Sequence, residues 1–392
     1  MMPGKGYRLP VVVILAAVVV LSIAGRAPAR QYPDCLQCHI HKKKAEGKYV
    51  HPIYKQGCHS CHTNAHLQES PFPKFLFNKG VDLCWACHEK AKFSRTVGHP
   101  PVAKGECLSC HDVHTSDTAK LLLAPMPDLC FMCHDKETFV NHTSHPPVAD
   151  GKCTSCHDPH SSDAKRLLLA EMPRLCFTCH NEERYISPTK KRHHPPVLNG
   201  KCMSCHEPHA SSARRLLITA IPDLCFTCHE AAYFKDTYTH APTASGMCTS
   251  CHEPHESDTR KLTIAQGADL CFTCHDKADF IKPGLHPPVA AGMCSVCHDP
   301  HAAPNIFQLR LPISEGCLQC HPRIAKAPHV LGGFTEAGHP LSGRKHEKSS
   351  SGELTCASCH TPHSSDYMKL FRYPAEKPMD LCKNCHEHPS GG

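Results

Sequence analysis

Thirty cysteines, all in one arrangement, are the residues of this chain whose types and spacing most directly suggest chemistry. Each belongs to a Cys-x-x-Cys-His motif, and fifteen such motifs follow one another, which leaves no cysteine over for a disulfide. The cysteine pairs are Cys35 and Cys38, Cys58 and Cys61, Cys84 and Cys87, Cys107 and Cys110, Cys130 and Cys133, Cys153 and Cys156, Cys176 and Cys179, Cys202 and Cys205, Cys225 and Cys228, Cys248 and Cys251, Cys271 and Cys274, Cys294 and Cys297, Cys317 and Cys320, Cys356 and Cys359, and Cys382 and Cys385.

Two thiols separated by two residues can form thioethers to the two vinyl groups of one haem, and the adjoining histidine then binds the iron from one face. The motifs therefore predict haem c, about fifteen per chain if each motif holds one. The predicted proximal ligands are His39, His62, His88, His111, His134, His157, His180, His206, His229, His252, His275, His298, His321, His360 and His386.

Zinc is the alternative for any single repeat, because two Cys-x-x-Cys pairs nineteen residues apart, as between Cys110 and Cys130, also match a zinc-ribbon spacing. A histidine follows every second cysteine, however, which zinc does not require. The lone motif at Cys35 also lacks a second cysteine pair. A disulfide scaffold would explain the even number of cysteines but not the histidines.

The motifs define a half-unit at 30–50 followed by seven doubled units, called repeats 1 to 7 below. Each repeat has an opening histidine, a first motif, a second non-motif histidine, a polar turn, a short apolar patch and a second motif. The predicted boundaries are 51–98, 99–144, 145–193, 194–239, 240–285, 286–338 and 339–392.

The two non-motif histidines of each repeat match in number the two haems of that repeat, and they are the predicted distal ligands. One such histidine alone could equally be a turn residue or a propionate partner, but the fixed offsets recur in all seven repeats. A histidine three residues after a motif histidine cannot reach the opposite face of the same haem, so we expect it to serve a neighbouring haem. The candidates are His51, His66, His99, His114, His145, His160, His194, His209, His240, His255, His286, His301, His339 and His363.

Methionine is the other common distal ligand, but Met126 and Met172 have Ile221 and Gly267 as counterparts, so we expect them to pack. The first haem, at Cys35, has no partner within a repeat. Its sixth ligand would come from a neighbouring chain or from one of the spare histidines, which are His41, His59, His142, His193, His329, His346 and His388.

The expected fold is mostly irregular coil with short α-helices, a multihaem cytochrome c repeat array packed around about fifteen covalent haems. The 35 prolines and 22 glycines break long elements. One or two helical turns are expected after the second motif, as at 135–139, 181–186 and 276–281, whereas pairs such as Pro100-Pro101 favour extended or turn backbone.

The N-terminus resembles a secretory signal peptide, with basic Lys5 and Arg8, an apolar run from 11 to 24 and Ala27-x-Ala29. We expect cleavage near residue 29, with a retained anchor as the alternative. The formal charge of +7 does not predict nucleic-acid binding, because haem propionates would make the holoprotein acidic. The scattered lysines and arginines are expected to pair with those propionates.

The unit that begins His145-Pro-Pro-Val and continues through Cys153-x-x-Cys156-His157-x-Pro-His160 resembles the doubled Cys-x-x-Cys-His domain of multihaem c-type cytochromes. It is similar to those of prokaryotes that respire metals or other extracellular acceptors. The resemblance implies low-potential electron transfer between closely spaced haems and a periplasmic, outer-membrane or extracellular location. It also implies redox-protein partners, including a porin–cytochrome complex or further copies of this chain in a polymer.

Two functions follow from this sequence. The first is an electron conduit without bond-making chemistry, in which nearly every iron has two histidine ligands. The second is a multihaem reductase, which needs an open iron position and a substrate pocket. The chain has no Cys-x-x-Cys-Lys motif, so an open site would most readily lie at the first haem or in the insert at 322–355.

Overall fold

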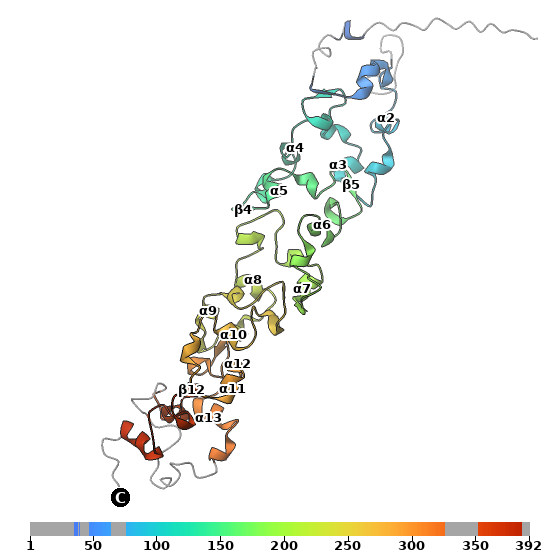
Figure 1. The fold of residues 1–392 in the computed structure, drawn as a ribbon. Coiled ribbons are helices and arrows are strands. Elements are labelled where there is room, and N and C mark those ends of the chain that lie inside the picture. The colour runs from blue at the N-terminus through green and yellow to red at the C-terminus, as the bar shows by residue number, and fades with distance from the viewer. Residues whose placement is uncertain (1–34, 38, 40–46, 64–75, 326–351, 386–392) are drawn as a thin grey trace, which may run out of the picture. The chain divides into compact units, whose positions relative to one another are not determined.

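The computed structural model describes residues 35–37, 39, 47–63, 76–325 and 352–385 (Figure 1). These residues belong to two compact bodies. The smaller body is drawn from Met1–Lys79 and His111–Leu123, and the larger body from Gly80–Cys110 and Ala124–Gly392. The predicted signal peptide lies outside the described residues, as do Cys38, His41, His66, His329, His339, His346, His386 and His388.

Short helices separated by coil make up most of the described chain, which confirms the expected fold at this level. The α-helices are α2 (Asp82–Trp85), α3 (Pro100–Ala103), α4 (Asp128–Phe131), α5 (Pro146–Ala149), α6 (Arg174–Phe177), α7 (Pro195–Leu198), α8 (Asp223–Phe226), α9 (Ala241–Ala244), α10 (Ala268–Cys271), α11 (Pro287–Ala290), α12 (Cys294–Cys297), α13 (Ile313–Leu318) and α14 (Cys356–Cys359).

Single 3-10 turns lie between these helices. Those after the second motif, η8, η11 and η17, confirm the helical turns expected there. The 3-10 elements are η1 (Cys35–Gln37), η2 (Pro52–Gln56), η3 (Cys58–Ser60), η5 (Lys90–Phe93), η6 (Cys107–Ser109), η7 (Ala119–Leu121), η8 (Lys136–Phe139), η9 (Cys153–Ser155), η10 (Lys165–Leu167), η11 (Glu182–Arg184), η12 (Cys202–Ser204), η13 (Arg214–Leu216), η14 (Ala231–Phe234), η15 (Cys248–Ser250), η16 (Arg260–Leu262), η17 (Lys277–Asp279), η18 (Ile306–Gln308), η19 (Pro322–Ala325), η21 (Met368–Leu370) and η22 (Pro378–Asn384).

The proline pairs are helical, and the expectation of extended backbone there was wrong. In α3, α5, α7 and α11 the prolines occupy the first two helical positions, where no backbone N–H is needed and their fixed φ suits a helix. The opening histidine before each pair keeps an extended backbone, as the residue before a proline should.

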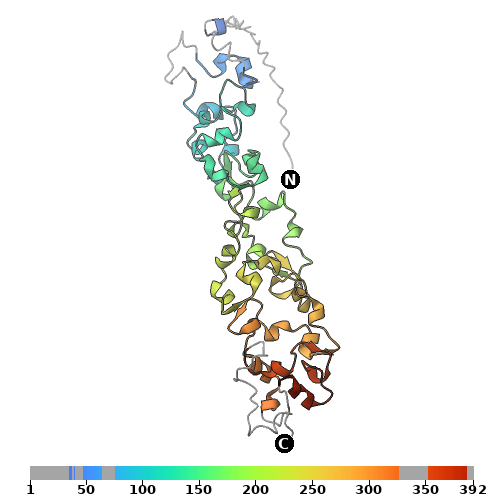
Figure 2. The same cartoon turned by 90° about the vertical axis from the view of Figure 1, so that its left-hand side faces the viewer.

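Two-residue antiparallel ladders join consecutive repeats within each body. A strand just before an opening histidine pairs with a strand just after the second non-motif histidine of the next repeat. Figure 2 shows the ribbon of the short elements and the coil between them from a second side. The pairs are β1 (Tyr49–Val50) with β3 (Thr115–Ser116), β2 (Val97–Gly98) with β5 (Ser161–Ser162), β4 (Thr143–Ser144) with β7 (Ala210–Ser211), β6 (Arg192–His193) with β9 (Glu256–Ser257), β8 (Tyr238–Thr239) with β11 (Ala302–Ala303), and β10 (Gly284–Leu285) with β12 (Ser364–Ser365).

Almost no side-chain core accompanies this backbone. The buried apolar residues among those described are Ala164, Leu175, Ala210, Ala303 and Phe371. Larger apolar side chains near the motifs are exposed, for example Met132 at 60% and Leu198 at 58%. A chain of this length normally buries most of the surface that its unfolded form exposes. The polypeptide alone therefore cannot account for a stable fold.

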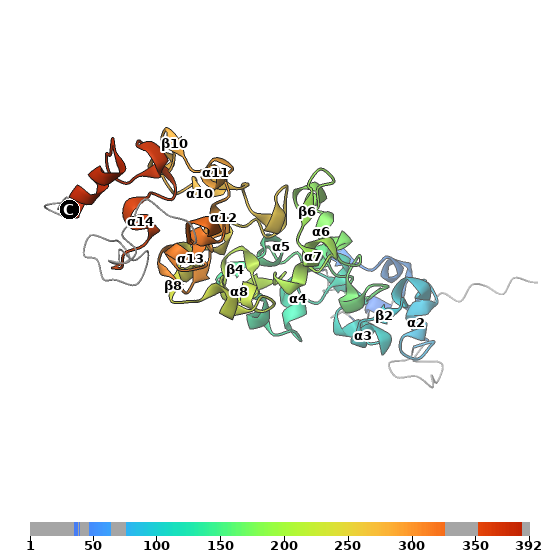
Figure 3. The same cartoon turned by 90° about the horizontal axis from the view of Figure 1, so that it is seen from below.

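Close backbone approaches bring one repeat against the next. Gly200, with φ +67°, lies so near Pro173 that a Cβ on it would be 2.7 Å from the proline Cδ. Gly151 and Gly246 approach Pro127 and Pro222 in the same way. At the last junction of the larger body, α13 contacts α14 instead (Figure 3).

Substitution Gly200→Ala is expected to destabilise the holoprotein. The left-handed backbone costs alanine about 1–2 kcal/mol, and the clash with Pro173 adds about 1–3 kcal/mol. Gly80→Ala is the matched control, because Gly80 also has a left-handed φ of +56° but no atom within 4 Å of its Cβ position. Thermal melting should show a larger fall in midpoint for Gly200→Ala; equal falls would contradict the close approach.

Candidate haem sites

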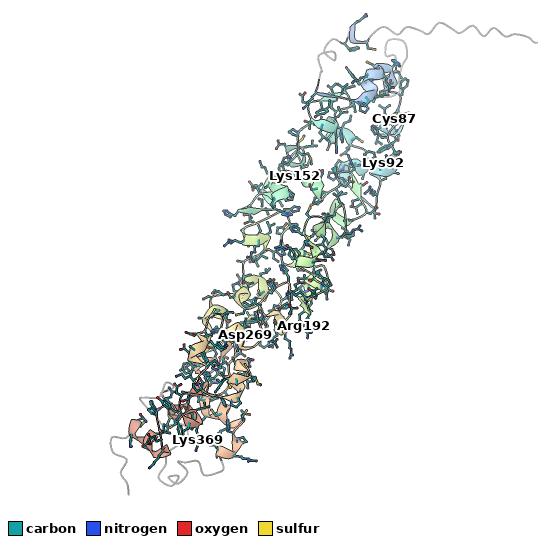
Figure 4. The ribbon with its side chains drawn as sticks, viewed as in Figure 1. Cys87, Lys92, Lys152, Arg192, Asp269 and Lys369 are labelled. Atoms are coloured by element: carbon teal, nitrogen blue, oxygen red, sulfur yellow. The ribbon has the colours of Figure 1, made fainter. Side chains whose placement is uncertain are left out.

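The first-motif histidines are held by a turn in their own repeat. Their Nδ1 atoms face a carbonyl nine residues later, so Nδ1 carries the proton and donates, and Nε2 becomes the nitrogen that can bind a metal. The acceptor residues have φ between +52° and +59° although none is glycine. The pairs are His111 with Lys120 at 3.0 Å, His157 with Arg166 at 2.9 Å, His206 with Arg215 at 3.1 Å, His252 with Lys261 at 2.9 Å, His298 with Phe307 at 2.8 Å, and His360 with Lys369 at 2.9 Å (Figure 4 labels Lys369).

The opening histidines are held by the following repeat. Their Nδ1 atoms donate to the carbonyl of the proline in that repeat's Cys-His-x-Pro-His sequence, so Nε2 is again the nitrogen that can bind a metal. The pairs are His99 with Pro159 at 3.0 Å, His145 with Pro208, His194 with Pro254, His240 with Pro300 at 3.0 Å, and His286 with Pro362 at 2.8 Å.

In repeats 2 to 6 the second non-motif histidine has a carboxylate beside Nδ1, supplied two residues earlier in the chain. The same carboxylate accepts the backbone N–H of the histidine, which fixes its position. The Nδ1–oxygen distances are 3.9 Å for His114 and Asp112, 3.8 Å for His160 and Asp158, 3.4 Å for His209 and Glu207, 3.5 Å for His255 and Glu253, and 3.8 Å for His301 and Asp299.

Motif and non-motif histidines face each other in pairs, with ring centres 6.0–6.4 Å apart and interplanar angles of 12–33°. In repeats 2 to 6 the opening histidine faces the second-motif histidine of its own repeat. The pairs are His99–His134, His145–His180, His194–His229, His240–His275 and His286–His321.

In repeats 2 and 4 to 7 the second non-motif histidine faces the first-motif histidine of the preceding repeat. These pairs are His62–His114, His157–His209, His206–His255, His252–His301 and His298–His363. Two imidazoles that bind one metal ion from opposite sides, with metal–nitrogen distances of about 2 Å, have ring centres about 6 Å apart. The spacing therefore fits an iron between the rings of each pair.

The cysteines of consecutive motifs lie next to one another. The first cysteine of a second motif is within hydrogen-bonding reach of the first cysteine of the next repeat. These pairs are Cys130–Cys153, Cys176–Cys202, Cys225–Cys248, Cys271–Cys294 and Cys317–Cys356. Within a repeat, the second cysteines of both motifs are neighbours instead, as in Cys110–Cys133, Cys156–Cys179, Cys205–Cys228, Cys251–Cys274, Cys297–Cys320 and Cys359–Cys385.

Burial shifts the pKa values of these cysteines and histidines in the folded arrangement. It raises the pKa of thiols such as Cys130 and Cys225 to about 11, helped by the neighbouring cysteines. It lowers the pKa of six histidines, so these imidazoles stay neutral near pH 7, the form that binds iron. The six are His145, His194, His209, His255, His301 and His363.

Aromatic rings pack against the second non-motif histidines, which sequence reasoning missed. Each ring follows the second motif of a repeat and contacts a histidine two repeats further along, so only the recurrence of an aromatic at that offset could have indicated it. The centroid distances are 5.0 Å for Phe93–His160, 5.1 Å for Phe139–His209, 5.3 Å for Tyr185–His255, 4.9 Å for Phe234–His301 and 5.0 Å for Phe280–His363.

The methionines pack, as expected. The Met126 and Met172 sulfurs lie 3.7 and 3.8 Å from Cys130 and Cys176 Sγ. The spare His193 is also engaged, because its Nε2 lies 3.2 Å from a buried Glu256 oxygen. All described cysteines are free of disulfides.

The chain belongs to the doubled CXXCH motif family, whose model matches residues 51–93, 99–139, 145–185, 194–233, 240–280, 286–326 and 346–391. This assignment makes it a multihaem c-type cytochrome, a class of exported electron-transfer proteins. The seventh match begins at His346 rather than at His339. No curated protein matches the chain.

Among the residues that the structure describes, no helix has both the length and the apolar character needed to cross a membrane. Within the same residues, no group of three or more histidine, cysteine, aspartate or glutamate side chains could hold a metal ion.

The chain produced without haem attachment is expected to be largely unfolded, because so few apolar side chains are buried. Far-UV circular dichroism should show little helix and no cooperative melting, and limited proteolysis should be rapid. The holoprotein in the same buffer is the control. A cooperative transition in the haem-free chain would contradict the view that haem supplies the core.

Proposed function

We propose that this protein conducts electrons along closely spaced haems, most of which are held between two histidines. The observation that carries the proposal is the set of facing imidazole pairs with centres 6.0–6.4 Å apart. When bound, haem iron supplies a one-electron Fe(III)/Fe(II) couple. The chain supplies the spacing, the orientation of the imidazoles and the charges around them.

Imidazole on both sides of the iron favours a low potential, because a thioether ligand in its place raises it. The carbonyl acceptors on Nδ1 strengthen this effect by making each ring a better donor. Acceptors such as Lys261 O and Pro300 O sit on short turns, so they hold the ring planes fixed during a change of oxidation state.

The cysteine contacts support an unbranched path in chain order. Cys153 neighbours the preceding motif through Cys130, and its partner Cys156 neighbours the following motif through Cys179. Each hop oxidises one site and reduces the next by one electron, with no bond formed or broken. A reduced protein at one end and an oxidised protein at the other would supply and remove the electrons.

The pairing rule also bears on the lone half-unit. The rule leaves His66 unmatched, because no repeat precedes repeat 1, and it leaves the motif histidine of the half-unit, His39, unmatched as well. We therefore infer that His66 is the sixth ligand of the first haem. Residue 66 lies outside the described residues, so this assignment is a prediction from the sequence alone.

The location and partners proposed here rest on the predicted signal peptide and on the family. The protein would act in the periplasm, at the outer membrane or outside the cell, and would exchange electrons with other cytochromes. About fifteen haems per chain are expected, one for each motif.

Visible and EPR spectra of the purified holoprotein test the proposal. Low-spin haem that does not bind carbon monoxide is expected, because both axial positions are filled. In His209→Ala the haem of His157 should lose its sixth ligand, show a high-spin signal and bind carbon monoxide. His209→Met restores a ligand and should remove both changes.

His142→Ala is the control, since His142 is an exposed histidine outside the motifs and the two repeated positions. A wild-type protein with a large high-spin fraction would favour the reductase alternative. An unchanged spectrum in His209→Ala would contradict the role of the second non-motif histidine.

A further inference from the structure

The residue two positions before each second non-motif histidine changes along the chain. In repeats 2 to 6 it is a carboxylate beside Nδ1, with the closest approaches at Glu207 (3.4 Å) and Glu253 (3.5 Å). In repeat 7 it is Thr361, whose hydroxyl donates to Ser364 O at 2.8 Å. The ring of His363 therefore has no carboxylate at this position, although it faces His298 at the same spacing as the other pairs.

A second position changes at the same end of the chain. Leu169, Ile218 and Ile264 each donate their backbone N–H to the second cysteine of the first motif. The structurally equivalent residues of repeats 6 and 7 are Arg310 and Arg372, with the same backbone bond. Neither guanidinium has a counterpart at this position in repeats 3 to 5.

The two arginines alter the charge near the distal imidazoles. Arg310 lies 3.0 Å from the second oxygen of Asp299, so it neutralises the carboxylate beside His301. Arg372 donates to Ala357 O in a repeat where Thr361 has replaced the carboxylate. The charge beside the second non-motif histidine therefore differs between repeats. Within the described part of the chain, His209 and His255 have a carboxylate without a paired cation, and His301 has a carboxylate paired with Arg310. His363 has a threonine in place of the carboxylate.

We propose that these residues grade the potentials of the first-motif haems, so that the potential rises from the first-motif haem of repeat 4 to that of repeat 6. The inference rests on the proposed bis-histidine ligation. A carboxylate facing Nδ1–H makes the imidazole a stronger donor and stabilises the ferric state, which lowers the potential. A neutral or cation-balanced site lacks that stabilisation.

Glu207, Glu253, Asp299, Arg310 and Thr361 are therefore positioning residues that act through the distal imidazole. The haem between His298 and His363 would have a higher potential than those between His157 and His209 and between His206 and His255. Electrons delivered from the N-terminal side would move downhill toward the C-terminal repeats. Because Glu207 and Glu253 are nearly half exposed, solvent reduces the effect but does not abolish it.

Three variants of the full-length holoprotein test the proposal. Glu253→Gln removes one uncompensated charge and should raise the potential of one haem. Arg310→Gln frees Asp299 and should lower the potential of the haem between His252 and His301. Arg372→Leu, which restores the leucine of repeat 3, serves as the background for the substitutions at 361, because Arg372 would otherwise balance a new carboxylate as Arg310 balances Asp299. In that background, Thr361→Asp places an uncompensated carboxylate before His363 and should lower the potential of the haem between His298 and His363.

Thr361→Asn is the matched control, because asparagine has the size of aspartate without its charge, and it should leave the potential unchanged. The potentials are measured by potentiometric titration followed by visible absorbance. A shift in one haem should appear as a displacement of one haem's fraction of the total absorbance change. A change of up to about tenfold in the ferric-to-ferrous ratio at fixed potential, or 59 mV for one electron, is expected.

Haem content by mass and low-spin EPR are recorded on the same samples. If wild-type spectra are high-spin, the proposed bis-histidine conduit fails. If all samples are low-spin and fully loaded but the three charge variants titrate like their parent proteins, or if Thr361→Asn shifts as far as Thr361→Asp, only the grading by charge is overturned.

Discussion

One backbone hydrogen bond recurs at each junction between repeats, and the arrangement of the histidines depends on it. The opening histidine donates its N–H to the carbonyl of the second non-motif histidine of the next repeat, as in His145 with His209 at 2.8 Å and His194 with His255 at 2.8 Å. The two side chains joined in this way face the two motif histidines of the earlier repeat. His145 faces His180, and His209 faces His157. A single main-chain hydrogen bond therefore positions the non-motif histidines of two pairs at once.

Strained turns hold the first-motif histidines, which are the other members of pairs such as His157–His209. Residues such as Lys120 and Arg166 adopt a left-handed backbone, which costs a non-glycine residue about 1–2 kcal/mol. The carbonyls of these residues accept the Nδ1–H of the first-motif histidines, and this hydrogen bond, which fixes the orientation of the ring, offsets the strain. A glycine there would relax the turn and loosen the imidazole that it holds. The absence of a conventional core among the described residues makes such local restraints more important here than in a globular domain.

The sequence predicted the motifs, the repeat and the sparse secondary structure, because each depends on neighbouring residues. A local steric argument also predicted that a histidine such as His209 would lie away from its own motif histidine. It could not predict that His209 faces His157, because the two come together through pairing between different repeats, including the ladder of β4 with β7. The proline pairs were misjudged because Pro100-Pro101 was considered without the preceding His99, which begins the helix. The assignment of histidines to haem irons stays a prediction for all the sites, and Cys38, His66, His339 and His386 also lie outside the described residues.

The facing histidines also show that one repeat of the sequence does not contain both histidines of each of its pairs. The partner of His252 belongs to the following repeat, whereas the partner of His275 belongs to its own. A gene duplication that inserts a whole repeat would preserve every pairing, whereas a cut inside a repeat would break pairings on both sides of it. Assembly during export would be directional for the same reason. A first-motif histidine gains its facing histidine only after the next repeat has been exported, so the sites would form in order from the N-terminal end of the chain.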